Sequence, residues 1–136
     1  MNTLSGHIAT IEIHGSIAII DVAVGGNHFT ATLLGNSEHL TAWKIGQAAR
    51  LLFKETEVAL AKNLSGQISM RNRMPGTVIA LEVGQVLTRV VFDMQGVCIN
   101  AVITSRSARG LQIAVGDAVE GLVKSNEMSV VTMEDQ

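Results

Sequence analysis

Cysteine is almost absent from this sequence of 136 residues, since Cys98 is the only one. One cysteine cannot form a disulfide within the chain, and a single thiol fits a reducing compartment. We expect Cys98 to lie buried in a strand. Any small lobe of this chain must therefore gain its stability from packing against other lobes or other subunits.

Aromatic residues are also scarce, with no Tyr, three Phe and one Trp. A binder of single-stranded nucleic acid needs stacking aromatics along a basic groove. This chain has a net charge of −2 and a pI near 6.0, so it has no general attraction for nucleic acid or anionic lipid. We expect no nucleic-acid partner, and any anion site must be local.

Long apolar runs are missing, although 47% of the residues are hydrophobic and only 16% are charged. No run approaches the roughly 18 residues that span a bilayer, so we expect no membrane insertion and place the apolar excess at interfaces. Met1–Gly6 has no basic region followed by an apolar core, as a signal peptide would. The expected location is the cytoplasm.

Residues for metal binding or catalysis form no recognisable pattern. The four histidines, at positions 7, 14, 28 and 39, lack ligand spacing and a cysteine cluster, which argues against zinc or iron. No nucleophile with a base, paired carboxylates or cofactor loop stands out. We expect a protein that is not an enzyme and has no organic cofactor.

What the sequence does contain is an internal repeat, because it matches itself without a gap when shifted by 70 residues. Glycines, apolar positions and one lysine keep register, which favours duplication of one supersecondary unit. The identical pairs are Asn2/Asn72, Gly6/Gly76, Glu12/Glu82, Gly26/Gly96, Ala31/Ala101, Ser37/Ser107, Gly46/Gly116, Ala48/Ala118, Leu52/Leu122, Lys54/Lys124 and Glu57/Glu127.

Each repeat predicts five short strands with one helical turn between the third and fourth. Alternation is clearest in the second strand of each repeat, at 16–24 and its partner, and a glycine hairpin follows it. Hydroxyl residues able to cap a helical turn begin at Ser105. The expected fold is all-β, with two tandem OB-like five-stranded barrels formed by residues 1–66 and 67–136.

The second repeat contains an ordered series of short motifs. They are Ser69-Met70-Arg71-Asn72, Met74-Pro75-Gly76, Ala101-Val102-Ile103-Thr104, Val115-Gly116 and Leu122-Val123-Lys124-Ser125. In their order and spacing these motifs resemble the molbindin (Mop/TOBE) family of molybdate-binding lobes, and the offset extends the resemblance over essentially the whole chain.

The resemblance implies sites for molybdate or tungstate between lobes of different subunits. Such a tetrahedral dianion only accepts hydrogen bonds, so its site must supply donors and positive charge and exclude carboxylates. Arg71 offers a planar fork and Lys124 a compact charge, with hydroxyls from Ser69 and Ser125. The other expected contributors are Asn72, Thr104, Ser105 and Ser107.

The first repeat departs from this pattern. Offset by 70, the arginine of the motif becomes Met1, and Ser125 becomes Glu55, whose carboxylate would repel a dianion. We expect no complete site in this lobe, with Lys54 or Ser37 lending a donor across an interface.

The resemblance implies non-catalytic binding, storage or homeostasis of molybdate or tungstate by a homo-oligomer, with a trimer favoured and a dimer as the other choice. An alternative is the ligand-sensing C-terminal part of a molybdate-responsive transcription regulator or of a molybdate-importer ATPase. The sequence supplies neither a helix-turn-helix nor a phosphate-binding loop of the Gly-x-x-x-x-Gly-Lys type.

Overall fold

The computed structural model describes residues 1–34 and 42–133. The first half of the chain contains β1 (Asn2–His14), β2 (Ile17–Val24), β3 (Asn27–Leu34), β4 (Ala48–Phe53), the 3₁₀ turn η1 (Glu55–Glu57) and β5 (Ala59–Ala61). The second half contains β6 (Asn72–Val83), β7 (Leu87–Met94), β8 (Val97–Thr104), the helix α2 (Ser105–Gly110), β9 (Ala118–Val123), the 3₁₀ turn η2 (Ser125–Glu127) and β10 (Ser129–Thr132).

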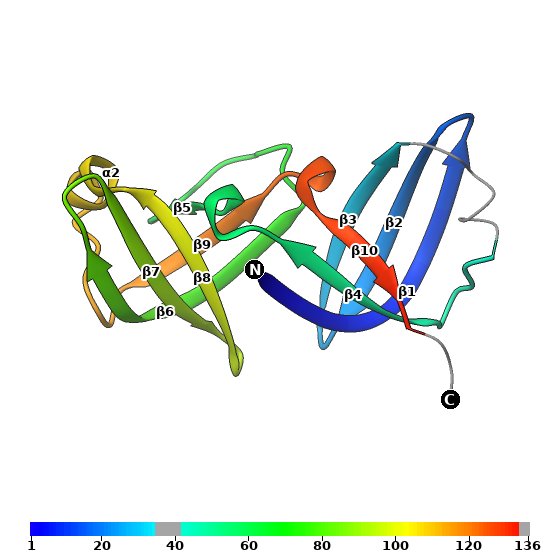
Figure 1. Cartoon of the computed structure of the whole chain (residues 1–136), viewed down its shortest axis with the longest axis horizontal. Coiled ribbons are helices and arrows are strands. Elements are labelled where there is room, and N and C mark those ends of the chain that lie inside the picture. Colours follow the sequence, from blue (N-terminus) through cyan, green and yellow to red (C-terminus); the bar gives the residue numbers. More distant parts are fainter. Residues whose placement is uncertain (35–41, 134–136) are drawn as a thin grey trace. The chain divides into compact units, whose positions relative to one another are not determined.

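These strands form two five-stranded sheets, with the orders β10-β4-β1-β2-β3 and β5-β9-β6-β7-β8. In each sheet the two outer strands approach one another, β10 towards β3 and β5 towards β8, so each sheet curves round towards closure. The expected all-β fold with two OB-like five-stranded lobes is confirmed. Figure 1 shows β10, coloured red, beside β4 of the first half.

The two compact units of the structure are not separated by a single boundary near residue 66, where the repeat places one. One compact unit contains Met1–Asn2 and Lys54–Val123, and we call it the β6 unit. The other, the β1 unit, contains Thr3–Phe53 and Lys124–Gln136. The difference arises because the halves exchange their last strands: β5 pairs with β9, and β10 pairs with β4. The repeat predicts similar lobes, but it does not reveal which copy of the fifth strand completes each one.

The long strand β6 shows how the repeat builds a lobe. Its first part pairs with β9, from Asn72 opposite Val123 onwards, and its second part pairs with β7. The register shifts between Val78 and Ala80, near the point where the strand changes partner. β1 shifts register at the equivalent place, between Ile8 and Thr10. A bulge bends a strand and increases its twist, so both copies curve at the same position.

The core of each unit follows from strand alternation. In β2, Ala18, Ile20 and Val22 are fully buried, and in β7 Thr88, Val90, Phe92 and Met94 are buried in the same way. The predicted alternation is confirmed in these strands, with one face of each covered by its own lobe. The remaining buried apolar residues are Leu4, Ile8, Phe29, Ala31, Ala49, Leu51, Phe53, Val58, Met74, Val78, Ile99, Ala101, Val119, Leu122, Val123 and Met128.

Gly76 occupies a strand position that a larger residue could not take. A Cβ at this position would fall against the backbone oxygen of Asp93 and 2.8 Å from the Phe92 ring. Its repeat partner Gly6 meets the backbone of Ala23 in the same way. The first identical glycine pair of the repeat therefore marks a close approach between neighbouring strands.

Candidate functional site

Arg71 and Lys124 flank the last residue pair of one β-ladder. Asn72 is paired with Val123 at the end of the β6–β9 ladder, Arg71 immediately precedes Asn72, and Lys124 immediately follows Val123. Both cationic residues and Ser69 are exposed. Among the described residues, neither Arg71 nor Lys124 has a carboxylate within ion-pair distance. Their charges therefore remain available to an anion.

Ser125 contacts a hydroxyl residue from the first half of the chain. Its Oγ lies 2.8 Å from Oγ1 of Thr32 on β3, within the β1 unit. Ser125 follows Lys124, the residue that precedes η2. Whichever hydroxyl donates in this pair, the other keeps its hydrogen for a further acceptor. The pair thus holds Ser125 in place while leaving one donor to offer.

The equivalent position of the first repeat has a different electrostatic character. Glu55 replaces the serine, and its carboxylate lies 3.5 Å from the guanidinium of Arg89 on β7. The Lys54 backbone N–H donates to the side chain of Glu57 at 2.9 Å, which stabilises the start of η1. Lys54 is exposed. Both neighbouring carboxylates are engaged, so Glu55 repels an anion less than its sequence suggests.

The asparagine of each repeat lies inside the protein. Asn72 is fully buried. Its repeat partner Asn2 uses both side-chain polar atoms on the backbone of Asn100 in β8, donating to the carbonyl at 2.8 Å and accepting from the N–H at 2.9 Å. This bidentate contact ties the start of β1 to β8 in the β6 unit. We infer a structural role for Asn72 by analogy and remove it from the proposed ligand contacts.

Thr104 is the residue that caps α2, one position earlier than the sequence suggests. Its Oγ1 accepts from the backbone N–H of Ser107 at 3.1 Å and donates to the Ser107 hydroxyl at 2.8 Å. Both residues are exposed. The Thr104 hydroxyl therefore gives its hydrogen to Ser107, and only Ser107 keeps a hydroxyl hydrogen for an external acceptor.

Ser105 holds the β6–β7 loop against the start of α2. Its hydroxyl donates to the carbonyl of Gly84 at 2.7 Å and lies 2.8 Å from the Thr88 hydroxyl, and its backbone N–H donates to the carbonyl of Val86 at 2.7 Å. Only 1% of Ser105 is exposed. An interior residue whose donors go to backbone carbonyls cannot present them to a ligand, so we also remove Ser105 from the ligand set.

Two further cations of the β6 unit are already paired. Arg73 donates twice to Glu120, at 2.7 and 2.8 Å, and this hydrogen-bonded pair raises the pKa of Arg73 above its usual range. Lys62 lies 3.1 Å from Asp117. The pKa of Asp117 is lowered, first by the hydrogen bond from the Ala114 backbone N–H and then by Lys62. These pairs are structural contacts between neighbouring segments.

Some sequence expectations fall outside the site or differ from the structure. Ser37 lies outside the described residues, as does the helical turn expected around it. Cys98 is exposed, not buried, because it lies on the outward face of the sheet's outer strand β8. In the described parts of the chain, no three His, Cys, Asp or Glu side chains cluster as metal ligands would. No described helix is long and apolar enough to cross a membrane.

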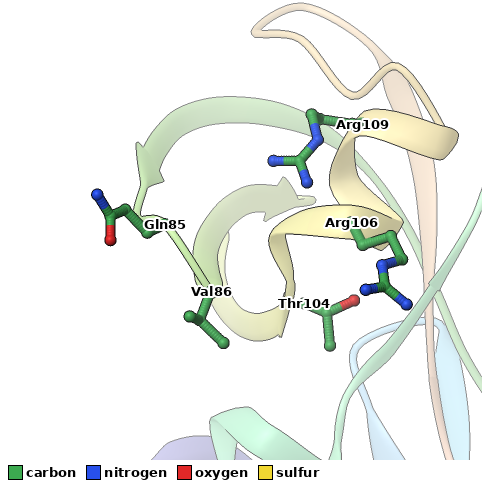
Figure 2. Close-up of a pocket in the computed structure, with 5 residues that line it drawn as sticks. All are labelled: Gln85, Val86, Thr104, Arg106 and Arg109. Carbon is green, nitrogen blue, oxygen red and sulfur yellow. The ribbon is translucent and has the colours of Figure 1, made fainter.

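Thr104 also lines a pocket in the β6 unit, together with four residues that the sequence does not single out. Its volume is about 380 Å³, and its lining residues are Gln85, Val86, Thr104, Arg106 and Arg109. Figure 2 shows the two arginines on α2 and Gln85 and Val86 on the loop that faces it. The spacing of Arg106 and Arg109 on a short helix was visible in the sequence, whereas the opposing loop was not.

Comparison with known proteins finds a family match in the second half of the chain. The family model described as the TOBE domain matches residues 68–130. The resemblance carried by the serine, arginine and lysine motifs is thereby confirmed for the second repeat. The matched range ends within β10, which lies in the β1 unit, so the TOBE sequence unit and the compact unit differ at their C-terminal ends.

Relatives with a similar sequence span nearly all of this chain. It is 28% identical over 137 residues to the molybdenum transport protein ModE of Herbaspirillum seropedicae, covering 98% of this chain and 51% of that protein. It is 31% identical over 123 residues to the molybdenum import ATP-binding protein ModC of Brucella abortus (strain 2308), covering 90% of this chain and 32% of that protein. The chain thus spans about half or less of these relatives.

One solved structure has the same fold over both lobes. It is the cytoplasmic molybdate-binding protein ModG with molybdate bound, which superimposes with a TM-score of 0.89 at 23% sequence identity. The match covers 95% of this chain and 94% of ModG. The fold of this chain therefore recurs in a protein of nearly the same length.

Proposed function

We propose that this protein binds molybdate or tungstate, with no chemistry performed on the anion. The observation that carries the proposal is that Arg71 and Lys124, which flank the end of one ladder, have no ion-pair partner among the described residues, in a chain whose residues 68–130 match the TOBE domain. Relatives named for molybdenum transport and a molybdate-binding protein of the same fold support this choice of ligand.

The proposed donor set is Ser69, Arg71, Lys124 and Ser125. A tetrahedral dianion accepts hydrogen bonds in every direction. These residues supply two positive charges and two hydroxyls, and no described carboxylate forms an ion pair with either cation. Thr104, Ser107 and Lys54 are further proposed contributors, since all three are exposed and the Ser107 hydroxyl keeps its hydrogen for an external acceptor. We propose that the sites are completed where lobes of different subunits meet.

We further propose that the protein is a cytoplasmic homo-oligomer, with a trimer favoured over a dimer. Each lobe is small, the chain has no disulfide, and large apolar side chains such as Ile79, Val83 and Val115 are exposed. Burying such residues between copies would supply the stability that a lobe of this size lacks. The physiological role would then be storage or homeostasis of the oxyanion.

Sensing within a larger protein is the second candidate function. It is favoured by the coverage of the relatives, because the chain corresponds to only 51% of ModE and 32% of ModC. In that case oxyanion binding at the same site would regulate another part of a transcription regulator or of a transporter. The length of the natural open reading frame distinguishes the two.

Calorimetric titration with molybdate, tungstate, sulfate and phosphate tests the ligand, on protein whose mass is measured by light scattering. We expect saturable heat with the first two only. Arg71→Gln and Lys124→Gln should each weaken molybdate binding by roughly tenfold or more, because a charged hydrogen bond contributes about 1.5–3 kcal/mol. Lys44→Gln, which removes an exposed lysine of the β1 unit, is the matched control. Unchanged affinity in both site variants would refute the placement.

A further inference from the structure

We propose that the outer face of the β1 unit carries a metal site, in which His7 and His28 together bind one divalent transition-metal ion, copper(II) most tightly. His7 lies on β1 and His28 on β3, with β2 between these two strands in the sheet (Figure 1). Ala23 of β2 lies between the two histidines, and we call these three residues the histidine row. None of them is among the residues proposed to bind molybdate.

The strand register places the histidine row in one line across the sheet. His7 is opposite Ala23 in the β1–β2 ladder, and Ala23 is opposite His28 in the β2–β3 ladder. Residues directly opposite one another in antiparallel strands have their side chains on the same face of the sheet. Sequence spacing does not reveal this arrangement, because the two histidines are far apart along the chain and belong to no ligand motif.

The face that carries the histidine row points away from the core. Each residue of the row has a chain neighbour that is buried, and these neighbours are Ile8, Val22 and Phe29. Successive side chains of a strand point to opposite faces, so the row itself points outwards. Both histidines are exposed and Ala23 is half-buried. The two imidazoles are therefore open to an ion from solvent, with only a methyl group between them.

The span of the histidine row suits two imidazoles that share one ion. Opposite Cα atoms are about 5.5 Å apart in a hydrogen-bonded antiparallel pair and about 4.5 Å apart in the other kind, and a residue of a middle strand has one partner of each kind. The Cα atoms of His7 and His28 are therefore about 10 Å apart. An imidazole side chain reaches more than half of that distance, so two rings that lean over Ala23 bring one nitrogen each to the same ion.

A negative charge lies beside the histidine row. Asp21 is two residues from Ala23 on β2, and its carboxylate accepts hydrogen bonds from the hydroxyls of Thr10 and Thr30 at 2.6 Å each. No described Lys, Arg or His lies within ion-pair distance of this carboxylate. A fixed charge of this kind attracts a cation. In the parts of the chain that the structure describes, no three potential metal ligands form a cluster, so Asp21 supplies charge and the histidines supply the ligands.

The chemistry of the ligands selects the ion. Imidazole suits copper, zinc and nickel, and for a given set of ligands copper(II) binds most tightly among the divalent ions of this series. Water supplies the remaining ligands. The equivalent row of the second repeat is Thr77, Asp93 and Cys98, which contains no imidazole. The site is therefore specific to the β1 unit, where a bound ion would join β1 to β3 across β2 and stabilise the folded sheet.

Titration of the untagged full chain with copper(II) tests this proposal, with calorimetry for the affinity and electron paramagnetic resonance for the ligands. All proteins carry Cys98→Ser, which removes the exposed thiol as a competing ligand. We expect one copper ion per chain with two imidazole nitrogens bound to it. His7→Gln and His28→Gln should each weaken binding by roughly a hundredfold, because the second imidazole no longer binds intramolecularly.

Two further variants separate a shared site from ordinary surface histidines. Ala23→Leu keeps both histidines but puts a larger side chain between their rings, so it should also weaken copper binding. His14→Gln removes another exposed histidine of β1 and should leave the affinity unchanged. All four substitutions lie on exposed or half-buried positions outside the core, and an amide NMR spectrum of each variant confirms that it is folded.

Three results would overturn the shared site. They are a single imidazole in the resonance spectrum, unchanged affinity in Ala23→Leu, and a loss in His14→Gln equal to that in His7→Gln. Because the histidine row contains none of the proposed molybdate contacts, molybdate affinity should be the same in every variant. The metal site and the proposed molybdate function therefore fail or stand independently.

Discussion

The exchange of last strands predicts that a core residue of the second repeat stabilises the lobe formed by the first. Met128 is 2% exposed, follows η2 and belongs to the β1 unit, together with β1 to β4. Its repeat partner Val58 is also 2% exposed and belongs to the β6 unit. Met128→Ala should therefore destabilise the β1 unit, and Val58→Ala the β6 unit.

The magnitude follows from the atoms removed. Truncating a buried methionine to alanine lowers the free energy of unfolding by about 2–5 kcal/mol, because the change removes buried apolar surface and also leaves a cavity. Val58→Ala removes two buried carbons, worth about 1.6 kcal/mol from transfer alone. Against a net stability of about 5–15 kcal/mol for a typical domain, either loss is large.

Amide hydrogen exchange resolves which lobe is affected. With Met128→Ala, protection of core amides in β1, β2 and β3 should fall by roughly 30-fold or more, since every 1.4 kcal/mol is tenfold. Amides of β7 and β8 should change far less. Val58→Ala should give the opposite pattern and serves as the internal control. Loss of protection in β7 and β8 alone with Met128→Ala would refute the strand exchange.

Two further predictions concern the β6 unit. Gly76→Ala should lower its stability by about 1–3 kcal/mol or more in urea unfolding, because the added Cβ meets the Asp93 backbone, whereas Gly110→Ala, which has open space, should be nearly neutral. The pKa of Asp117 is lowered in the folded protein, so its ionised carboxylate stabilises the fold. This stabilisation is fully present at a pH above the ordinary pKa of 3.8, and it is lost as the pH falls through the lower folded pKa. Asp117→Asn should therefore lower the melting temperature at pH 7 and flatten its decline between pH 5 and 2; identical slopes for both proteins would count against the Lys62 and Ala114 contacts.

The fold was largely predictable from sequence because the evidence for it is local. Strand alternation acts within one repeat, the gap-free offset carries it to the other, and together they place β2 and β7 within a residue or two. The exchange of β5 and β10 was not predictable, because both copies of the last strand carry similar apolar residues and fit either sheet. Only the three-dimensional pairing distinguishes them.

The candidate site was predictable in its residue types and less so in its geometry. Arg71 and Lys124 were singled out through their motifs, and their shared role in binding stays a prediction. Ser105 was misjudged because a hydroxyl before a helical turn has the same sequence signature whether it faces solvent or a neighbouring loop. Thr32 was missed because no repeat partner or motif marks it, although it lies 2.8 Å from Ser125.

The pairing of β10 with β4 also determines when the first lobe can be finished during synthesis. Ser129–Thr132 are synthesised long after β1 to β4, yet they form an outer strand of the same sheet. The early strands must therefore wait, with the edge of β4 uncovered, until β10 has emerged from the ribosome. Such long-range closure slows folding and leaves an open strand edge to be protected in the meantime.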